Sequence, residues 1–126
     1  MGDVLPIGAG PVNYSTDEQV IGTWIDGKPV YQKVLVDKCP NSAGVKDYAH
    51  NISNVGVLRV TEAFMKWNGV NEYAPIPTFS ASSSVSINTA LLTIIGATST
   101  AIRVRADENR STHDLYIILQ YTKTTD

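Results

Sequence analysis

The sequence is poor in cysteine, in charged residues and in long apolar runs. Its single cysteine, Cys39, cannot form an intramolecular disulfide, so the fold must be stable without one. Charged residues make up 17% of the chain and the formal net charge is −2, which argues against a nucleic-acid partner. The longest apolar run, residues 91–97, is broken by Thr93 and Gly96 and is far too short to span a bilayer. We therefore expect neither nucleic-acid binding nor membrane insertion.

The first residues carry no recognisable targeting signal. Met1 and Gly2 are followed by the acidic Asp3, and Pro6 occupies the position at which a myristoylation signal has a hydroxyl residue. We expect a protein that is made in a cytoplasm without a signal peptide. Residues 1–13 contain three glycines and two prolines, which predicts a short extended leader or connector ahead of one folded module, residues 14–126.

Residues that favour strands outnumber those that favour helices. Val, Ile and Thr account for 36 of the 126 residues, whereas Glu, Lys, Arg, Gln and Leu together account for 24. Apolar residues are 43% of the chain, which is enough to build the core of a single domain. Because short alternating segments follow one another between turn signals, we predict an all-β protein, an antiparallel β-sandwich of jelly-roll type.

The clearest local signal is Asp26-Gly27 between two apolar segments. It predicts a tight type I′ hairpin, in which both central residues have positive φ. Trp24 and Tyr31 flank the turn and are expected to form a cross-strand aromatic pair. Just before the hairpin, residues 15–18 have the form of a capping box, which predicts one short helical turn.

Further strands are expected over six segments of alternating polarity, residues 45–50, 55–67, 73–79, 85–95, 101–105 and 113–123. Pro75 and Pro77 confine the third of these to a sheet edge, and Asn68-Gly69 before it is a hairpin signal. In the second, the alternation predicts Phe64 on the face of Leu58 and Val60, with Ala63 and Met65 on the other face.

Two of these strands are apolar on both faces, around residues 91–95 and 116–118. An antiparallel sheet with one face in water does not need the second apolar face. That face must be covered by another layer of the same chain or by another copy of it. We expect an oligomer in which these residues form the subunit interface.

Aromatic and amide side chains gather around the predicted turn after residue 67. One hypothesis is that Trp67, Asn68, Asn71 and Tyr73 bind a glycan, because aromatic faces stack on sugar rings and amides bond their hydroxyls. The alternative is that they pack the hairpin. Asp107 and Arg110, in a charged loop, form a second candidate ligand-binding site, for which the alternative is a solvated loop.

His50 stands before the long strand, and three roles are open to it. It is a structural histidine bonded to a turn carbonyl, a metal ligand on an oligomer axis, or a glycan contact. We predict no enzyme, no catalytic residue and no cofactor, because the two histidines have no zinc-site spacing and no Gly-x-Ser-x-Gly segment occurs. A carboxylate pair for glycoside hydrolysis stays open, since the chain has twelve acidic residues.

Three segments of the chain resemble parts of known phage proteins. They are residues 14–33 (YSTDEQVIGTWIDGKPVYQK), 49–54 (AHNISN) and 116–126 (YIILQYTKTTD). Similar segments recur in this order in tail-fibre and other virion proteins of phages and prophages of Gram-positive bacteria. The resemblance spans residues 14–126, and its first and last segments are the specific ones.

The resemblance implies a β-sandwich module at the distal end of a phage tail fibre or related appendage. Such a module is located in the virion, forms a homotrimer, contacts other virion tail proteins and acts as a receptor-binding protein that attaches to host-surface carbohydrate. The long N-terminal shaft of many members is missing here, which leaves a piece of a longer fibre or a stand-alone protein. The alternatives are a purely structural virion component and an enzyme that degrades cell-wall polysaccharide.

Overall fold

The computed structural model describes residues 14–67, 72–77 and 92–126. Within these ranges every regular element is a β-strand and there is no helix, which confirms the all-β prediction. The strands are β1 (Gln19–Thr23), β2 (Pro29–Lys38), β3 (Gly44–Ala49), β4 (Val55–Lys66), β5 (Tyr73–Pro75), β6 (Leu92–Ala97), β7 (Ala101–Ala106) and β8 (Asp114–Lys123). The same ranges contain no helix able to cross a membrane. The predicted leader, residues 1–13, lies outside them.

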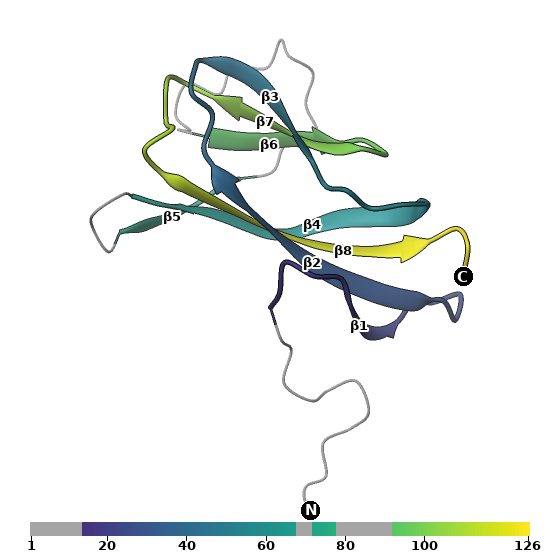
Figure 1. Ribbon diagram of the computed structural model, residues 1–126. Helices are drawn as coiled ribbons and strands as arrows, with labels where there is room; N and C mark the ends of the chain where they lie inside the picture. The colour runs from purple at the N-terminus through teal and green to yellow at the C-terminus, as the bar shows by residue number, and fades with distance from the viewer. Residues whose placement is uncertain (1–13, 68–71, 78–91) are drawn as a thin grey trace, which may run out of the picture.

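The strands form two antiparallel sheets (Figure 1). The larger sheet has the order β1-β2-β8-β4-β5 and the smaller one the order β3-β7-β6. β8, the last strand of the chain, lies at the centre of the larger sheet because β2 and β4 both pair with it. The two sheets face each other across the core, which is the sandwich-like arrangement that the alternation predicts.

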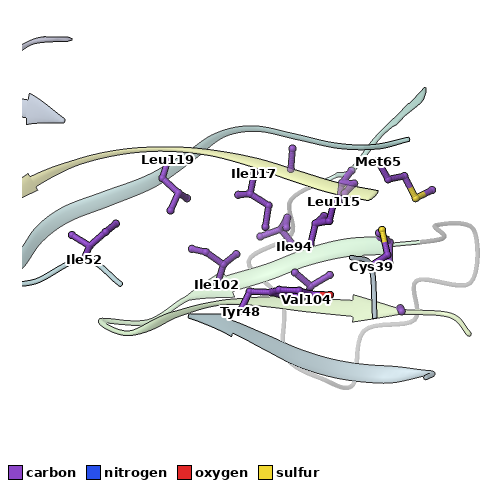
Figure 2. Close-up of a cluster of buried hydrophobic side chains, with 14 of the residues drawn as sticks. Cys39, Tyr48, Ile52, Met65, Ile94, Ile102, Val104, Leu115, Ile117 and Leu119 are labelled. Atoms are coloured by element: carbon purple, nitrogen blue, oxygen red, sulfur yellow. The ribbon is translucent and has the colours of Figure 1, made fainter. Parts of the chain in front are cut away.

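Figure 2 shows the inward side chains of both sheets meeting in one cluster. β8 contributes every second residue, Leu115, Ile117, Leu119 and Tyr121, and β7 contributes Ile102 and Val104. All six are almost completely buried, as their alternation predicts. These two strands therefore fix the distance and the orientation of the two sheets.

Residues 15–18 do not form the predicted helical turn. The Ser15 hydroxyl accepts a hydrogen bond from the Asp17 amide at 3.0 Å, which closes a local turn, and the chain continues directly into β1. Glu18, which a capping box would turn back toward Ser15, instead accepts hydrogen bonds from Tyr121 and Lys123. Tertiary contacts thus override the local helix signal.

β1 and β2 form the predicted hairpin, but its turn is not of type I′. Gly27 has φ 86°, whereas Asp26 is not at positive φ, and the Trp24 amide bonds the Lys28 carbonyl at 2.8 Å. This is a three-residue loop closed by a glycine in the left-handed region. Beyond the loop a register shift between Val20 and Gly22 places Tyr31 opposite Val20, so the predicted pair of Trp24 with Tyr31 is wrong.

A bulge in β4 changes the face on which its later residues lie. The pairing with β8 shifts between Val60 and Glu62, so Ala63 and Met65 point into the core. Leu58 and Val60, before the bulge, also pack against the core. Phe64 therefore lies on the face opposite to theirs, contrary to the prediction, because one extra residue reverses the alternation of a strand.

β5 is a short strand at the edge of the larger sheet, as the prolines predict. Asn68-Gly69, the predicted turn between β4 and β5, lies outside the described residues. So does most of the predicted strand 85–95, of which β6 is the described end.

The two predicted subunit-interface segments have different environments. Leu92, Thr93 and Ile94 are each at most 1% exposed within the single chain, so the predicted interface is wrong for these residues. Tyr116 and Ile118 lie on the outer face of the larger sheet, the face turned away from the smaller sheet, as the alternation of β8 predicts. Both strands are therefore apolar on both faces, but only β8 places apolar residues on the outer face of a sheet.

Candidate functional site

The two candidate ligand-binding regions meet at one end of the sandwich. In the register of the larger sheet, Lys66 at the end of β4 is paired with Tyr73 of β5 on one side and with Asp114 of β8 on the other. The loop that carries Asp107 and Arg110 leads directly into β8. We call this end, comprising residues 66–67, 72–73 and 107–114, the loop end (Figure 1).

Trp67 joins the two regions. Its ring lies against that of His113, with centroids 5.2 Å apart and planes 40° apart, and its amide donates to the Glu72 carbonyl at 3.0 Å. The indole is half-buried against the core. Its position is therefore held from both sides, and only part of the ring can contact a ligand.

Tyr73 is the most accessible aromatic side chain of the loop end, with 60% of its surface exposed. The Lys66 ammonium lies 6.0 Å from its ring centroid, at the limit of a cation–π contact. An open aromatic face beside a hydrogen-bond donor is the combination that a sugar ring requires. Asn68 and Asn71, predicted to belong to the same site, lie outside the described residues.

Asp107 and Arg110 bind each other. Arg110 donates from Nε and Nη2 to the two carboxylate oxygens of Asp107 at 2.9 and 2.8 Å, a bidentate pair. This hydrogen bonding holds the pKa of Asp107 below its ordinary value and raises the pKa of Arg110. The Arg110 amide also donates to the Pro40 carbonyl at 2.7 Å. The pair fixes the loop, and a ligand that needs either charge must compete with this contact.

Cys39 lies just behind the loop and is closed to solvent. Its amide donates to the His113 carbonyl at 3.0 Å, and the side chain is 1% exposed. Burial raises the pKa of its thiol to about 11, so it stays protonated at neutral pH. It packs as a small apolar residue.

His50 lies at the other end of the sandwich, beyond the pairing of Ala49 with Ala101, and is completely buried. The Ile52 amide donates to its Nδ1 at 3.1 Å, so Nε2 carries the proton and donates to the Thr98 carbonyl at 3.0 Å. These are the contacts of a structural histidine bonded to a turn carbonyl. A metal or axial role would require the ring to give up one of them. Across residues 14–67, 72–77 and 92–126, no group of three His, Cys, Asp or Glu side chains is arranged to hold a metal.

A polar cluster that the sequence did not single out joins the segment before β1 and strand β2 with β8 and the residue Asp126. Tyr121 and Lys123 donate to the two Glu18 carboxylate oxygens at 2.5 and 2.6 Å, and Tyr31 donates to Asp126 at 2.6 Å. Burial raises the pKa of Glu18, but the hydrogen bonds from Lys123 and Tyr121 outweigh it and lower the value overall. No periodic pattern could have revealed this cluster, because it depends on the pairing of β2 with β8.

Comparisons of the chain with models of protein families, with curated proteins and with solved structures found no match.

Proposed function

We propose that this chain is a homotrimeric module of a phage tail fibre or related virion appendage. In this proposal the module attaches to a carbohydrate of the host surface through its loop end, and its other contacts are with virion tail proteins. It is a binding module of jelly-roll type, and no catalytic step is assigned to it.

The observation that carries the proposal is that the three segments resembling phage proteins contact one another. Tyr31 of the first segment and Tyr121 of the last are paired across β2 and β8. The Lys33 ammonium of the first segment donates to the His50 carbonyl of the middle one at 2.8 Å. The Thr124 amide of the last segment donates to the Asn54 carbonyl of the middle one at 2.8 Å. Segments far apart in the sequence thus form one continuous piece of the fold, as parts of a single recurrent module would.

The loop end is built from residues outside those three segments. Residues 66–73 and 107–114 can therefore differ between related modules while the shared contacts remain unchanged. Such a separation suits a receptor-binding protein, because its ligand can change without loss of the supporting sheet. This is why we place the carbohydrate contact at Tyr73 and Trp67, with Lys66 and the Asp107–Arg110 pair beside them.

The second candidate is a purely structural virion component. It is favoured by the way the polar and aromatic groups of the loop end are engaged within the chain. Asp107 is bound to Arg110, and Trp67 is packed against His113. A surface whose groups already satisfy one another needs no ligand.

Binding of the full chain to purified Gram-positive cell walls and to a glycan array decides between the two. Tyr73→Ala is expected to weaken binding at least about tenfold, a loss of roughly 1.4 kcal/mol. Ile25→Ala is the matched control, because Ile25 is 93% exposed in the β1–β2 turn at the opposite end of the sheet, and it should bind as the parent does. A folded oligomer that binds no wall and no glycan would favour the structural component. Release of reducing sugar from the walls would favour the enzyme hypothesis.

A further inference from the structure

The outer face of the larger sheet is arranged in rows across the strands. Paired residues of neighbouring strands lie on the same face, so the register defines each row. One row contains Val36, Tyr116, Phe64 and Pro75 from β2, β8, β4 and β5, and the next contains Val34, Ile118 and Glu62. We call these two rows the apolar rows.

The apolar rows are unusual for the outside of a two-layer sandwich, where alternation normally puts polar residues. Phe64 and Tyr116 stack with centroids 4.9 Å apart, and Val36 is 52% exposed. Together with Tyr14 and Ser15 the rows line an open hollow of about 480 Å³. Val36 and Pro75 are exposed, whereas Ile118 in the middle of the rows is only 8% exposed. The other apolar members, Val34, Phe64 and Tyr116, are half-buried. The accessible part of the rows therefore offers an apolar surface with room for inserted side chains.

A polar row borders the apolar rows on one side. Arg59 donates to the Gln120 Oε1 at 2.7 Å, and the Gln120 Nε2 donates to the Gln32 Oε1 at 3.0 Å. Because Arg59 can only donate, it fixes the orientation of both amides. Gln32 is 4% exposed, and its Nε2 has no hydrogen-bond partner among the described residues.

The same face carries charged side chains in two places. Lys38, Lys66 and Asp114 share the row nearest the loop end, and Arg59 and Glu62 lie farther along β4. Arg59 lies in the polar row and Glu62 at the end of an apolar row, and neither forms an ion pair within the part of the chain that the structure describes. On the side of the loop end the face is bounded by the ion pair of Lys38 with Asp114. An apolar centre with a polar rim is the anatomy of a protein–protein interface.

We infer that the outer face of the larger sheet is the surface on which another copy of this chain docks. The face is complementary to itself. A second copy supplies a carboxylate for Arg59, a guanidinium for Glu62 and apolar side chains for the apolar rows. Around a threefold axis, Glu62 of one copy can meet Arg59 of the next, while the apolar rows of neighbouring copies pack together. The apolar rows offer few hydrogen-bonding groups, which a carbohydrate would need. The inference rests on the proposed trimer and specifies its interface.

Light scattering coupled to size-exclusion chromatography of the full chain at micromolar concentrations tests the inference. The parent chain is expected to be a trimer, and Val36→Glu is expected to raise the dissociation constant at least about tenfold. Val45→Glu is the matched control, since Val45 is also a half-exposed strand valine, at 46%, but lies on the smaller sheet. Circular dichroism of both variants checks that each is folded.

A charge exchange makes the test independent of any single unfavourable substitution. Glu62→Arg and Arg59→Glu alone are each expected to weaken the trimer, because each places like charges opposite one another. The double exchange should restore the trimer if the two charges meet across the interface. Failure of the double variant to recover would contradict the pairing.

The outcomes separate this inference from the proposed function. A parent trimer that Val36→Glu leaves intact would overturn the inference and leave the trimeric module in place. A parent chain that is monomeric at every concentration would overturn both the interface and the trimer. That result would point to another cover for the apolar rows, such as a different virion protein or residues 1–13 of the same chain.

Discussion

Tyr31 and Tyr121 stack on each other across β2 and β8, with ring centroids 5.6 Å apart and planes 18° apart. Around them Glu18, Lys123 and Asp126 complete a cluster that joins residues near both termini. The Lys123 ammonium also lies 4.6 Å from the Tyr31 ring centroid. Side chains near the beginning and the end of the module thus hold β1 and β2 against the central strand β8.

Removing the hydroxyl of Tyr121 tests how much this cluster contributes to stability. Tyr121→Phe leaves the stacked rings in place but removes the hydrogen bond that this almost completely buried tyrosine donates to Glu18, a carboxylate that is 34% exposed. A hydrogen bond to a charged group contributes about 1.5–3 kcal/mol. We therefore expect the substitution to lower the free energy of unfolding, measured in urea, by an amount at the lower end of that range. Tyr31→Phe is the control, because Tyr31 is only half-buried and donates to Asp126 in an exposed contact, so the loss of its hydroxyl should matter less. Equal losses in the two variants would contradict the argument.

The same cluster predicts a loss of stability in acid. The pKa of Glu18 in the folded chain lies below its ordinary value of 4.5, since the hydrogen bonds from Lys123 and Tyr121 outweigh the effect of burial. A carboxyl group whose folded pKa is depressed stabilises the fold above its unfolded pKa, and this contribution disappears as the pH falls through the folded value. Unfolding monitored from pH 7 down to pH 3 should show the decline, and Glu18→Gln should flatten it. The remaining slope would come from Asp47 and Asp107, whose pKa values are lowered by Arg103 and Arg110.

The sequence predicts the strands whose two faces differ in polarity. β7 and β8 were predictable because strict alternation places Ile102, Val104 and the odd residues of β8 inward. The extra residues at the register shifts belong to their partners β6 and β4, so the alternation within β7 and β8 is unbroken. β4 also alternates in polarity, but its bulge between Val60 and Glu62 depends on the partner strand, so Phe64 was wrongly assigned to the face of Leu58 and Val60. Periodicity cannot reveal a bulge, because the extra residue has no distinctive chemistry.

The candidate site was predictable in its parts but not in its arrangement. The aromatic residues after β4 and the charged loop before β8 are visible as local clusters in the sequence. Their meeting at one end follows from the pairing of Lys66 with Asp114, which is a property of the sheet register. The bidentate contact of Asp107 with Arg110 and the buried environment of His50 depend on three-dimensional neighbours in the same way.

His50 should behave as a structural residue. His50→Ala would leave the buried Ile52 amide without its acceptor, which costs about 1–3 kcal/mol, and would also remove the bond from the ring to the Thr98 carbonyl. We expect a clear fall in the melting temperature of the variant. The parent chain should melt at the same temperature with and without EDTA. A lower melting temperature of the parent in EDTA would support the metal role instead.

The thiol of Cys39 should be unreactive in the folded chain. It is buried, and burial raises its pKa to about 11, so very little thiolate exists at pH 8. Titration with a thiol reagent at this pH should show no reaction under native conditions and one thiol in urea. Rapid labelling of the native chain would mean that the loop above Cys39 opens readily.

Gly56 tests the packing of β4 against β8. A Cβ at this position would lie 2.8 Å from the Thr122 Oγ1, which accepts a hydrogen bond from the Val57 amide at 3.0 Å. Gly56→Ala must therefore displace that hydroxyl, and we expect a loss of about 1–3 kcal/mol, the usual range for overpacking. Gly22→Ala is the control, because nothing lies within 4 Å of its added Cβ. In a Thr122→Ala background the obstructing atom is gone, so Gly56→Ala should cost much less there. An equal cost in both backgrounds would show that the strain comes from the backbone of β8 rather than from the hydroxyl.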